Sequence, residues 1–218
     1  MLLSTAYFPP IEYFAKIAEG FTLSPGSMKP SVVYLEACEN YQKQSYRNRC
    51  LYFAGDGVQA LNVPVVHRDG TFVHPIAEIE VDYTTPWVVR TERAIASAYE
   101  SSPYFDYYKD ELFAILDSHP NTLFELNFRI LEFFLRKTGI PAVIRLTPEY
   151  FREAPAIYGE DLRERIHPKR NNTILEDLGL KKPYFQVFSG KYGFKSNLSI
   201  MDLLFNEGPE SIVWLKRV

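Results

Sequence analysis

Three cationic side chains and a hydroxyl occur within the short segment from Tyr41 to Arg49. If the backbone is extended there, the two-residue alternation of a strand places one set of side chains on a common face: Lys43, Ser45, Arg47 and Arg49. Such a face could hold a phosphate, a diphosphate or a carboxylate, because arginine offers a two-pronged donor. The alternative is that these cations pair with Glu36 and Glu39 just upstream, or lie in solvent. The spacing leaves both interpretations open.

The same region contains the groups best suited to proton transfer. Glu36 and Tyr41 are the candidate proton-handling groups, and Lys43 completes the candidate catalytic set. Asn127 lies in the apolar stripe of a predicted helix, where an unpartnered amide would cost about 1–3 kcal/mol. It is therefore expected either to bond a loop backbone or to reach into a site. The candidate substrate-binding set is Ser45, Arg47, Asn48, Arg49, Trp87, Thr91, Asn127 and Asn197.

The remaining candidates do not favour metal or thiol chemistry. His67, Asp69 and His74 are metal-ligating types, but their spacing matches no closed site, so no metal ion is expected. Cys38 has no histidine partner nearby in the sequence and is interpreted as a plain buried thiol. The other cysteine is Cys50, so a disulfide framework is not expected either. The cofactor is left open.

Charge and hydropathy argue against several classes of protein, namely nucleic-acid binders, membrane-spanning proteins and secreted proteins. The net charge is −3 and the pI is about 5.9, whereas nucleic-acid binders are usually basic on at least one face. No apolar run approaches the length of about 18 residues that a membrane span needs, and the segment 1–7 lacks the basic start of a signal peptide. The common nucleotide-loop, zinc-protease, serine-hydrolase and CxxC motifs do not occur. We therefore expect a cytoplasmic protein with no nucleic-acid partner.

The pattern of apolar and polar residues predicts the helices and strands that position the candidate residues. Helices are predicted over 10–20, 87–100, 104–116, 121–137 and 199–208. Strands are predicted over 2–7, 31–37, 76–83 and 142–146, together with a hairpin of 48–54 and 58–65 around a glycine-rich turn. The polar segment 155–183 has the character of a mobile or active-site loop. Strands followed by helices indicate an α+β fold, with a mixed or antiparallel sheet and several packed helices in a single domain over 1–218.

Five blocks of the sequence, in order and nearly end to end, resemble the WbqC-like family. They are residues 6–16, the region 36–49, residues 61–65, the helical region 87–105 and a C-terminal signature over 186–209. The chain is identified as a member of this family. In the helical block the resemblance leads us to expect a His-Trp pair, and this chain has Thr91-Glu92 instead. A reaction that depended on that histidine would be lost or altered here.

The resemblance also implies a field of activity. Some family members are encoded among genes for surface polysaccharide such as O-antigen, which implies a role in building or decorating a sugar, with acyl or aminoacyl transfer as one form. Our first hypothesis is a transferase that acts on a nucleotide-sugar or another phosphorylated substrate, with Lys43, Arg47 and Arg49 holding the anion. The second is a non-catalytic binding or assembly protein that uses the basic 41–49 face. The oligomeric state is left open.

Overall fold

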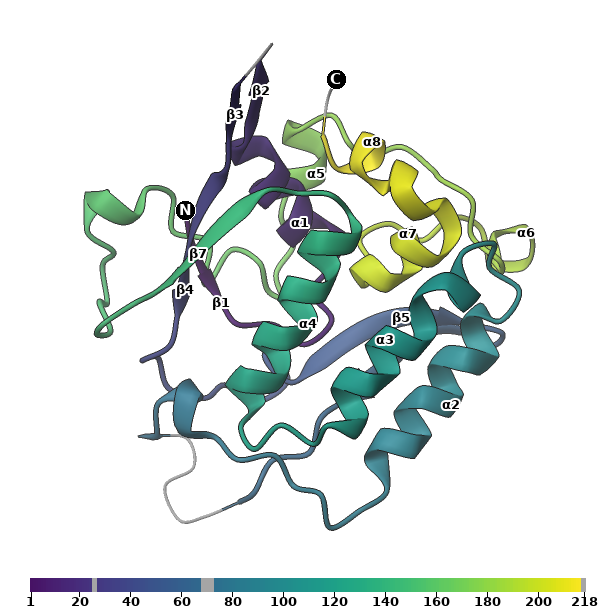
Figure 1. Cartoon of the computed structure of the whole chain (residues 1–218), viewed down its shortest axis with the longest axis horizontal. Coiled ribbons are helices and arrows are strands. Elements are labelled where there is room, and N and C mark those ends of the chain that lie inside the picture. The colour runs from purple at the N-terminus through teal and green to yellow at the C-terminus, as the bar shows by residue number, and fades with distance from the viewer. Residues whose placement is uncertain (25–26, 68–72, 217–218) are drawn as a thin grey trace.

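The structure is a computed structural model that describes residues 1–24, 27–67 and 73–216 (Figure 1). Its central sheet has three parallel strands in the order β1 (Leu2–Ser4), β4 (Ser31–Glu36) and β7 (Ala142–Leu146). Two antiparallel hairpins lie outside this sheet. One pairs β2 (Thr22–Ser24) with β3 (Ser27–Lys29), and the other pairs β5 (Arg49–Ala54) with β6 (Gly57–Asn62).

Helix α1 (Ile11–Gly20) follows β1 and packs against β4. Proline at position 10 suits the start of the helix, because it has no N–H that would be left without a partner. The apolar side of α1 reaches the core, where the ring centroid of Phe14 lies 6.1 Å from that of Phe134 in an edge-on contact. The helix ends at Gly20, where a Cβ atom would approach Ser31 Oγ to 2.9 Å, so a larger residue would push the helix away from β4.

Three longer helices form the middle of the chain: α2 (Trp87–Tyr99), α3 (Phe105–Asp117) and α4 (Leu123–Lys137). Figure 1 shows α4 next to the central sheet and α2 and α3 side by side beyond it. The hydroxyl of Thr122 caps α4 by accepting a hydrogen bond from the N–H of Glu125 at 3.2 Å. The shorter elements are η2 (Ile76–Glu78), η3 (Ala156–Tyr158), α5 (Ile174–Asp177), α6 (Ser189–Tyr192), α7 (Ile200–Glu207), η4 (Gly208–Glu210) and α8 (Ser211–Leu215).

The α+β class is confirmed, with parallel and antiparallel strands and several packed helices around one apolar core. The extended backbone on which the common cationic face depended does not form, because the chain turns from 43 to 48 and the strand β5 begins at Arg49. The prediction of a strand over 76–83 is wrong. The segment 76–83 forms the short helix η2 followed by isolated bridges, because its backbone bonds the start of α4: Leu123 N–H donates to Ile79, and Val81 N–H donates to Asn121.

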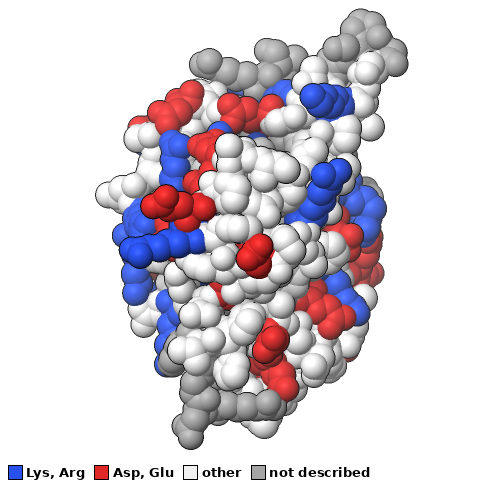
Figure 2. All heavy atoms as spheres, turned by 90° about the vertical axis from the view of Figure 1, so that its left-hand side faces the viewer, with Lys and Arg blue, Asp and Glu red and all other residues white. Residues whose placement is uncertain are grey.

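The surface toward the left of Figure 1 is turned to the viewer in Figure 2. Basic and acidic side chains are intermixed there with uncharged ones, so the described residues on this face present no continuous basic surface. Within the described ranges, no helix combines the length and the apolar character that crossing a bilayer requires.

Candidate functional site

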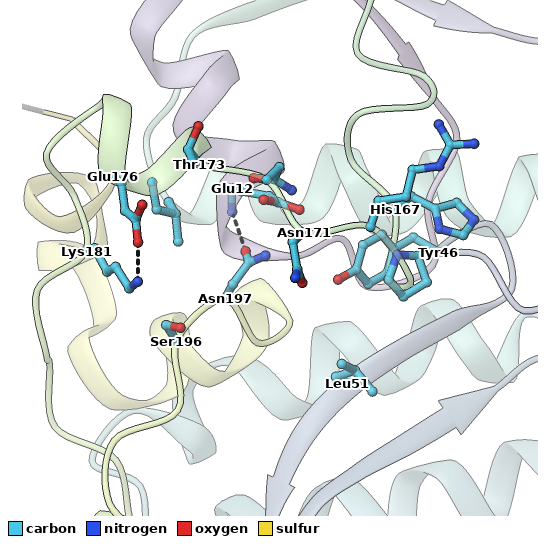
Figure 3. Close-up of a pocket in the computed structure, with 14 residues that line it drawn as sticks. Glu12, Tyr46, Leu51, His167, Asn171, Thr173, Glu176, Lys181, Ser196 and Asn197 are labelled. Atoms are coloured by element: carbon cyan, nitrogen blue, oxygen red, sulfur yellow. Dashed lines mark hydrogen bonds and ion pairs between the residues drawn. The ribbon is translucent and has the colours of Figure 1, made fainter.

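A polar cavity of about 540 Å³ opens beside the N-terminal end of α1 (Figure 3). This volume is in the range of small-molecule sites. Segments far apart in the sequence line it: the start of α1, the turn before β5, the strand β5, the segment 167–181, and the loop before α7. The lining residues are Glu12, Tyr46, Leu51, His167, Pro168, Arg170, Asn171, Asn172, Thr173, Leu175, Glu176, Lys181, Ser196 and Asn197.

The wall of the cavity at α1 is held by a reciprocal contact between two helix starts. The N–H of Ile11 donates to the carbonyl of Leu198 at 3.0 Å, and the N–H of Ile200 donates to the carbonyl of Pro9 at 2.9 Å. Asn197 adds its side chain, because its Oδ1 accepts a hydrogen bond of 3.0 Å from the N–H of Glu12. The two helices therefore fix the positions of Glu12 and Asn197 relative to each other.

Glu12 is the buried carboxyl group of the cavity, with a residue exposure of 2 %. Burial raises the pKa of this carboxyl, while hydrogen bonding with Asn197 and Asn172 and the charge of Arg165 act in the opposite direction. Figure 3 shows Glu12, Asn171 and Asn197 close together in the middle of the cavity. A buried carboxyl among amides, with its pKa moved toward neutral, is a typical arrangement for a proton-transferring group.

His167 and Tyr46 lie together at one end of the cavity (Figure 3). Burial, and then the charge of Arg170, lower the pKa of His167, so the ring is neutral near pH 7. Its Nδ1 accepts a hydrogen bond of 3.1 Å from the N–H of Lys169, which leaves Nε2 as the protonated nitrogen of the neutral ring. Burial raises the pKa of the Tyr46 phenol, so this hydroxyl stays protonated.

Cations border the cavity on two sides. Lys181 pairs with Glu176, and Arg170 pairs with Glu164 at 2.7 Å. All four side chains of these pairs are more than half exposed, so the pairs are weak and an incoming anion can compete with the carboxylates. Arg49 begins β5 on the strand face of Leu51, which lines the cavity. Its Nε is buried and has no hydrogen-bond partner among the described residues.

The structure does not place the predicted cationic face on one surface. Arg47 is buried, and its guanidinium contacts both carboxylate oxygens of Glu39, from Nε at 2.8 Å and from Nη2 at 2.5 Å. This is the pairing that the sequence left as the alternative. Ser45 belongs to the same turn, because its hydroxyl donates to the carbonyl of Gln42 at 2.8 Å. The common face fails because residues 41–48 form turns, so alternate side chains point in different directions.

Glu36 is also buried away from the cavity. Its carboxylate accepts hydrogen bonds from Arg163 at 2.9 Å and from the hydroxyl of Thr147 at 2.7 Å. Arg163 binds Asp161 as well, so this network anchors the segment that continues to His167. Tyr41 is buried, and burial raises its pKa to about 12. The catalytic roles of Glu36, Tyr41 and Lys43 stay predictions.

Of the other five predicted binding residues, one lines the cavity and four do not. Asn197 lines the cavity, whereas the remaining four are absent from its lining: Asn48, Trp87, Thr91 and Asn127. Asn127 Nδ2 donates to the carbonyl of Arg47 at 2.8 Å, which is the bond to a loop backbone foreseen as one alternative. Asp69 lies outside the described residues. Among the described residues, no group of three or more His, Cys, Asp or Glu side chains is arranged to hold a metal ion.

Sequence reasoning missed Glu12, His167, Asn171 and Asn172. Two signals pointed toward them. Glu12 is an acidic residue in an otherwise apolar helix start, and the polar segment 155–183 had the character of an active-site loop. The pattern could not show that this segment closes over the start of α1.

Comparison with known proteins agrees with the resemblance in the sequence. The model of the WbqC-like protein family matches residues 5–155, more than half of the chain. The chain belongs to the WbqC-like protein family. The matched range includes Glu12 and Tyr46 and ends before His167.

One relative in this comparison is the uncharacterized protein Rv1507c of Mycobacterium tuberculosis. It is 26 % identical over 199 residues, which cover 81 % of this chain and 84 % of that protein. No solved structure matches the chain.

Proposed function

We propose that this WbqC-like protein is a transferase that acts on a nucleotide-sugar or another phosphorylated sugar, with the polar cavity as its active site. The observation that carries the proposal is the buried carboxyl of Glu12, which lies among amides in the same cavity as His167. The link to surface polysaccharide comes from the resemblance to the family.

The lining of the cavity suits a hydroxylated and anionic compound. Asn171, Asn172 and Asn197 can exchange hydrogen bonds with sugar hydroxyls, because a carboxamide both donates and accepts. Arg170 and Lys181 can leave their exposed carboxylate partners for a phosphate. Arg49 brings a buried donor atom on the strand face of Leu51.

The two titratable groups supply the proton chemistry that group transfer needs. In transfer of a glycosyl, acyl or aminoacyl group, a hydroxyl or amine attacks the donor carbon, the bond to the leaving group breaks, and the attacking group loses its proton. Glu12, whose pKa is raised by burial, is suited to take that proton as a carboxylate and to give it to the leaving oxygen as the acid. Neutral His167, whose Nδ1 accepts from Lys169, is suited to donate a hydrogen bond from its protonated Nε2 to the donor or to the leaving oxygen.

Thermal unfolding against a panel of nucleotide-sugars, acyl-carrier thiols and aminoacyl donors tests the proposal first. A compound that binds only the native state raises Tm in proportion to RT ln(1 + [L]/Kd). We expect a nucleotide-sugar or sugar phosphate to raise Tm and the corresponding unphosphorylated sugar to do so less. A panel without any shift would contradict the proposal.

Two matched variants then test the role of Glu12. Glu12→Gln keeps the size of the side chain and removes the acid, so turnover of a binding donor should fall by about 10²–10⁴-fold. Glu19→Gln is the control, because Glu19 is on the same helix but exposed. Equal turnover in the two variants would remove Glu12 from the chemistry.

A further inference from the structure

A second, smaller pocket adjoins the polar cavity. The two spaces are neighbours, because the same four residues line both of them: Leu175, Lys181, Ser196 and Asn197. Figure 3 shows Lys181 and Ser196 at the end of the polar cavity that lies away from His167 and Tyr46. A compound bound in the polar cavity can therefore extend into the second pocket at this end.

Apolar side chains form most of the wall of this second pocket, which we call the annex pocket. The helices α1, α5, α7 and α8 each contribute one of them, and the segment between α5 and α7 contributes two more. These six residues are Ile11, Leu175, Leu180, Phe194, Leu203 and Trp214. The polar cavity beside it is lined largely by amides and charged groups, so the two spaces suit different parts of a ligand.

Two aromatic residues of the annex pocket have polar atoms, and both atoms already have partners. The hydroxyl of Tyr184 donates to Asp202 at 2.5 Å, and Nε1 of Trp214 donates to Glu207 at 3.2 Å. Each group has a single hydrogen to donate, so neither offers one to a ligand or to water. A water molecule needs about two to four polar partners to be stable in a pocket. The annex pocket therefore favours an apolar group over water.

The size of the annex pocket limits its occupant. Its volume is about 20 Å³, whereas the polar cavity has about 540 Å³. About 10–15 Å³ admits one water-sized group, so the annex pocket has room for roughly one or two non-hydrogen atoms. A methyl or ethyl group fits this space, and a nucleobase or a long alkyl chain does not.

The junction between the two spaces is polar and cationic. Ser196 and Asn197 bring a hydroxyl and an amide there, and Lys181 brings one of the cations to which we assign the phosphate. The other lysine of the annex pocket is Lys182, whose Nζ lies 4.8 Å from the ring centroid of Trp214. A ligand that fits both spaces thus has a phosphate and a polar connecting group side by side, and a short apolar end beyond the connecting group.

We propose that the phosphorylated sugar of the polar cavity is a 2-acylamino sugar, and that its short acyl chain lies in the annex pocket. In such a sugar the phosphate on C1 and the amide on C2 are attached to neighbouring carbons, and the acyl chain continues from the amide. A deoxy sugar with a bare methyl group lacks the polar connection that the junction suits. This inference rests on the proposed function, because it concerns part of the same substrate.

NMR titration with matched pairs of sugar 1-phosphates tests the inference. The pairs are N-acetylglucosamine 1-phosphate with glucose 1-phosphate, and N-acetylgalactosamine 1-phosphate with galactose 1-phosphate. In at least one pair we expect the acetamido compound to bind at least about tenfold more tightly, because filling an apolar pocket with a small group discriminates by about that factor. Saturation transfer should be strongest at its acetyl methyl protons.

The possible failures of this experiment are distinguishable. Equal Kd values within both pairs would overturn the inference and leave the proposed function intact. Binding of none of the four compounds would contradict the proposed function, and the inference with it. Tighter binding of an acetamido compound with saturation transfer confined to its ring protons would also overturn the inference, because the methyl group would then lie outside the annex pocket.

A change in the size of the pocket connects this preference to the annex residues. Phe194 is only partly buried, so Phe194→Leu should fold, which its thermal transition verifies, and should enlarge the pocket. N-butyrylglucosamine 1-phosphate should bind the unmodified protein more weakly than the N-acetyl compound. In Phe194→Leu its affinity should rise at least about fourfold, the effect of burying one more methylene group. Phe185→Leu is the control, because Phe185 is 56 % exposed and absent from the pocket lining. The same acyl preference in both variants, or tighter binding of the N-butyryl compound by the unmodified protein, would contradict the assignment.

Discussion

The guanidinium of Arg47 contacts both carboxylate oxygens of Glu39, and both residues are at most 4 % exposed. Arg47 Nη2 also donates to the hydroxyl of Ser4 at 2.8 Å, so the pair joins the turn before β5 to the first strand. Arginine in this segment therefore holds the backbone that places Tyr46 in the cavity wall.

Replacement of one partner in this buried pair should be costly. Arg47→Met leaves the carboxylate of Glu39 buried and unpaired, so the free energy of unfolding should fall by about 3–5 kcal/mol. The double variant Arg47→Met with Glu39→Leu removes both charges and should recover most of that loss. Urea denaturation measures both. Arg129→Met is the control, because its exposed pair with Glu125 is worth less than about 1 kcal/mol. If the double variant is as unstable as Arg47→Met, the unpaired carboxylate of Glu39 is not the cause of the loss of stability.

Asn197 combines a capping side chain with a left-handed backbone, at φ 56°. Asn197→Gly should lower stability by about 1 kcal/mol, because the N–H of Glu12 loses its acceptor while glycine accepts the backbone angle. The free energy of unfolding of Asn197→Ala should be about 1 kcal/mol lower than that of Asn197→Gly, because the left-handed backbone conformation is unfavourable for alanine. Chemical denaturation of the two variants side by side gives the difference. Equal stabilities would mean that the positive φ angle is not required there.

Because the pKa of Asp202, in the first turn of α7, is raised, we expect the stability of the protein to depend on pH. It is fully buried, and burial raises its pKa to about 6, although Tyr184, Gln186 and Tyr99 donate hydrogen bonds to it. The pKa in the folded state is thus above the unfolded value of 3.8. The stability that Asp202 contributes is therefore fully present below about pH 4 and is lost as the pH rises through about 6. The loss amounts to about 3 kcal/mol.

Thermal unfolding between pH 4 and pH 7 measures this effect. Asp202→Asn cannot titrate, so its stability should change less over this range than that of the unmodified protein. Asp110→Asn changes an exposed residue and should keep the original slope. The same slope in all three proteins would mean that Asp202 is ionised throughout the range.

Two buried tyrosines should respond in opposite ways to loss of the hydroxyl. The Tyr7 hydroxyl has no partner among the described residues, so Tyr7→Phe should raise the stability of the ligand-free protein, by up to about 1–3 kcal/mol. The Tyr99 hydroxyl donates to Asp202 at 3.0 Å and accepts from the N–H of Phe53 at 3.3 Å. Tyr99→Phe should therefore lower stability by about 1–3 kcal/mol. Denaturation midpoints of the two variants decide the signs, and a loss in both would mean that the Tyr7 hydroxyl is hydrogen-bonded to the nearby Thr91.

The sequence alone was sufficient for the elements whose signals are local. The apolar stripes predicted α1 to α4, Gly57 at φ 116° allows the turn between β5 and β6, and Ser199 caps α7 as predicted. Membership of the WbqC-like family was also readable, because its blocks occur in order along the chain. These features depend on near neighbours, so short stretches of sequence contain the necessary information.

Only the tertiary structure decided what the charged residues do. For Arg47 the sequence left open an anion-binding face or a pair with Glu36 and Glu39, and the structure buries it against Glu39, because the chain turns in this segment rather than extending. Glu12 was not singled out from the sequence, and it lies in a cavity, because residues 167–176 and Asn197 close over the start of α1. Whether a charged side chain binds a ligand or holds the fold depends on which distant segments pack against it, and the spacing of residues along the chain does not record that packing.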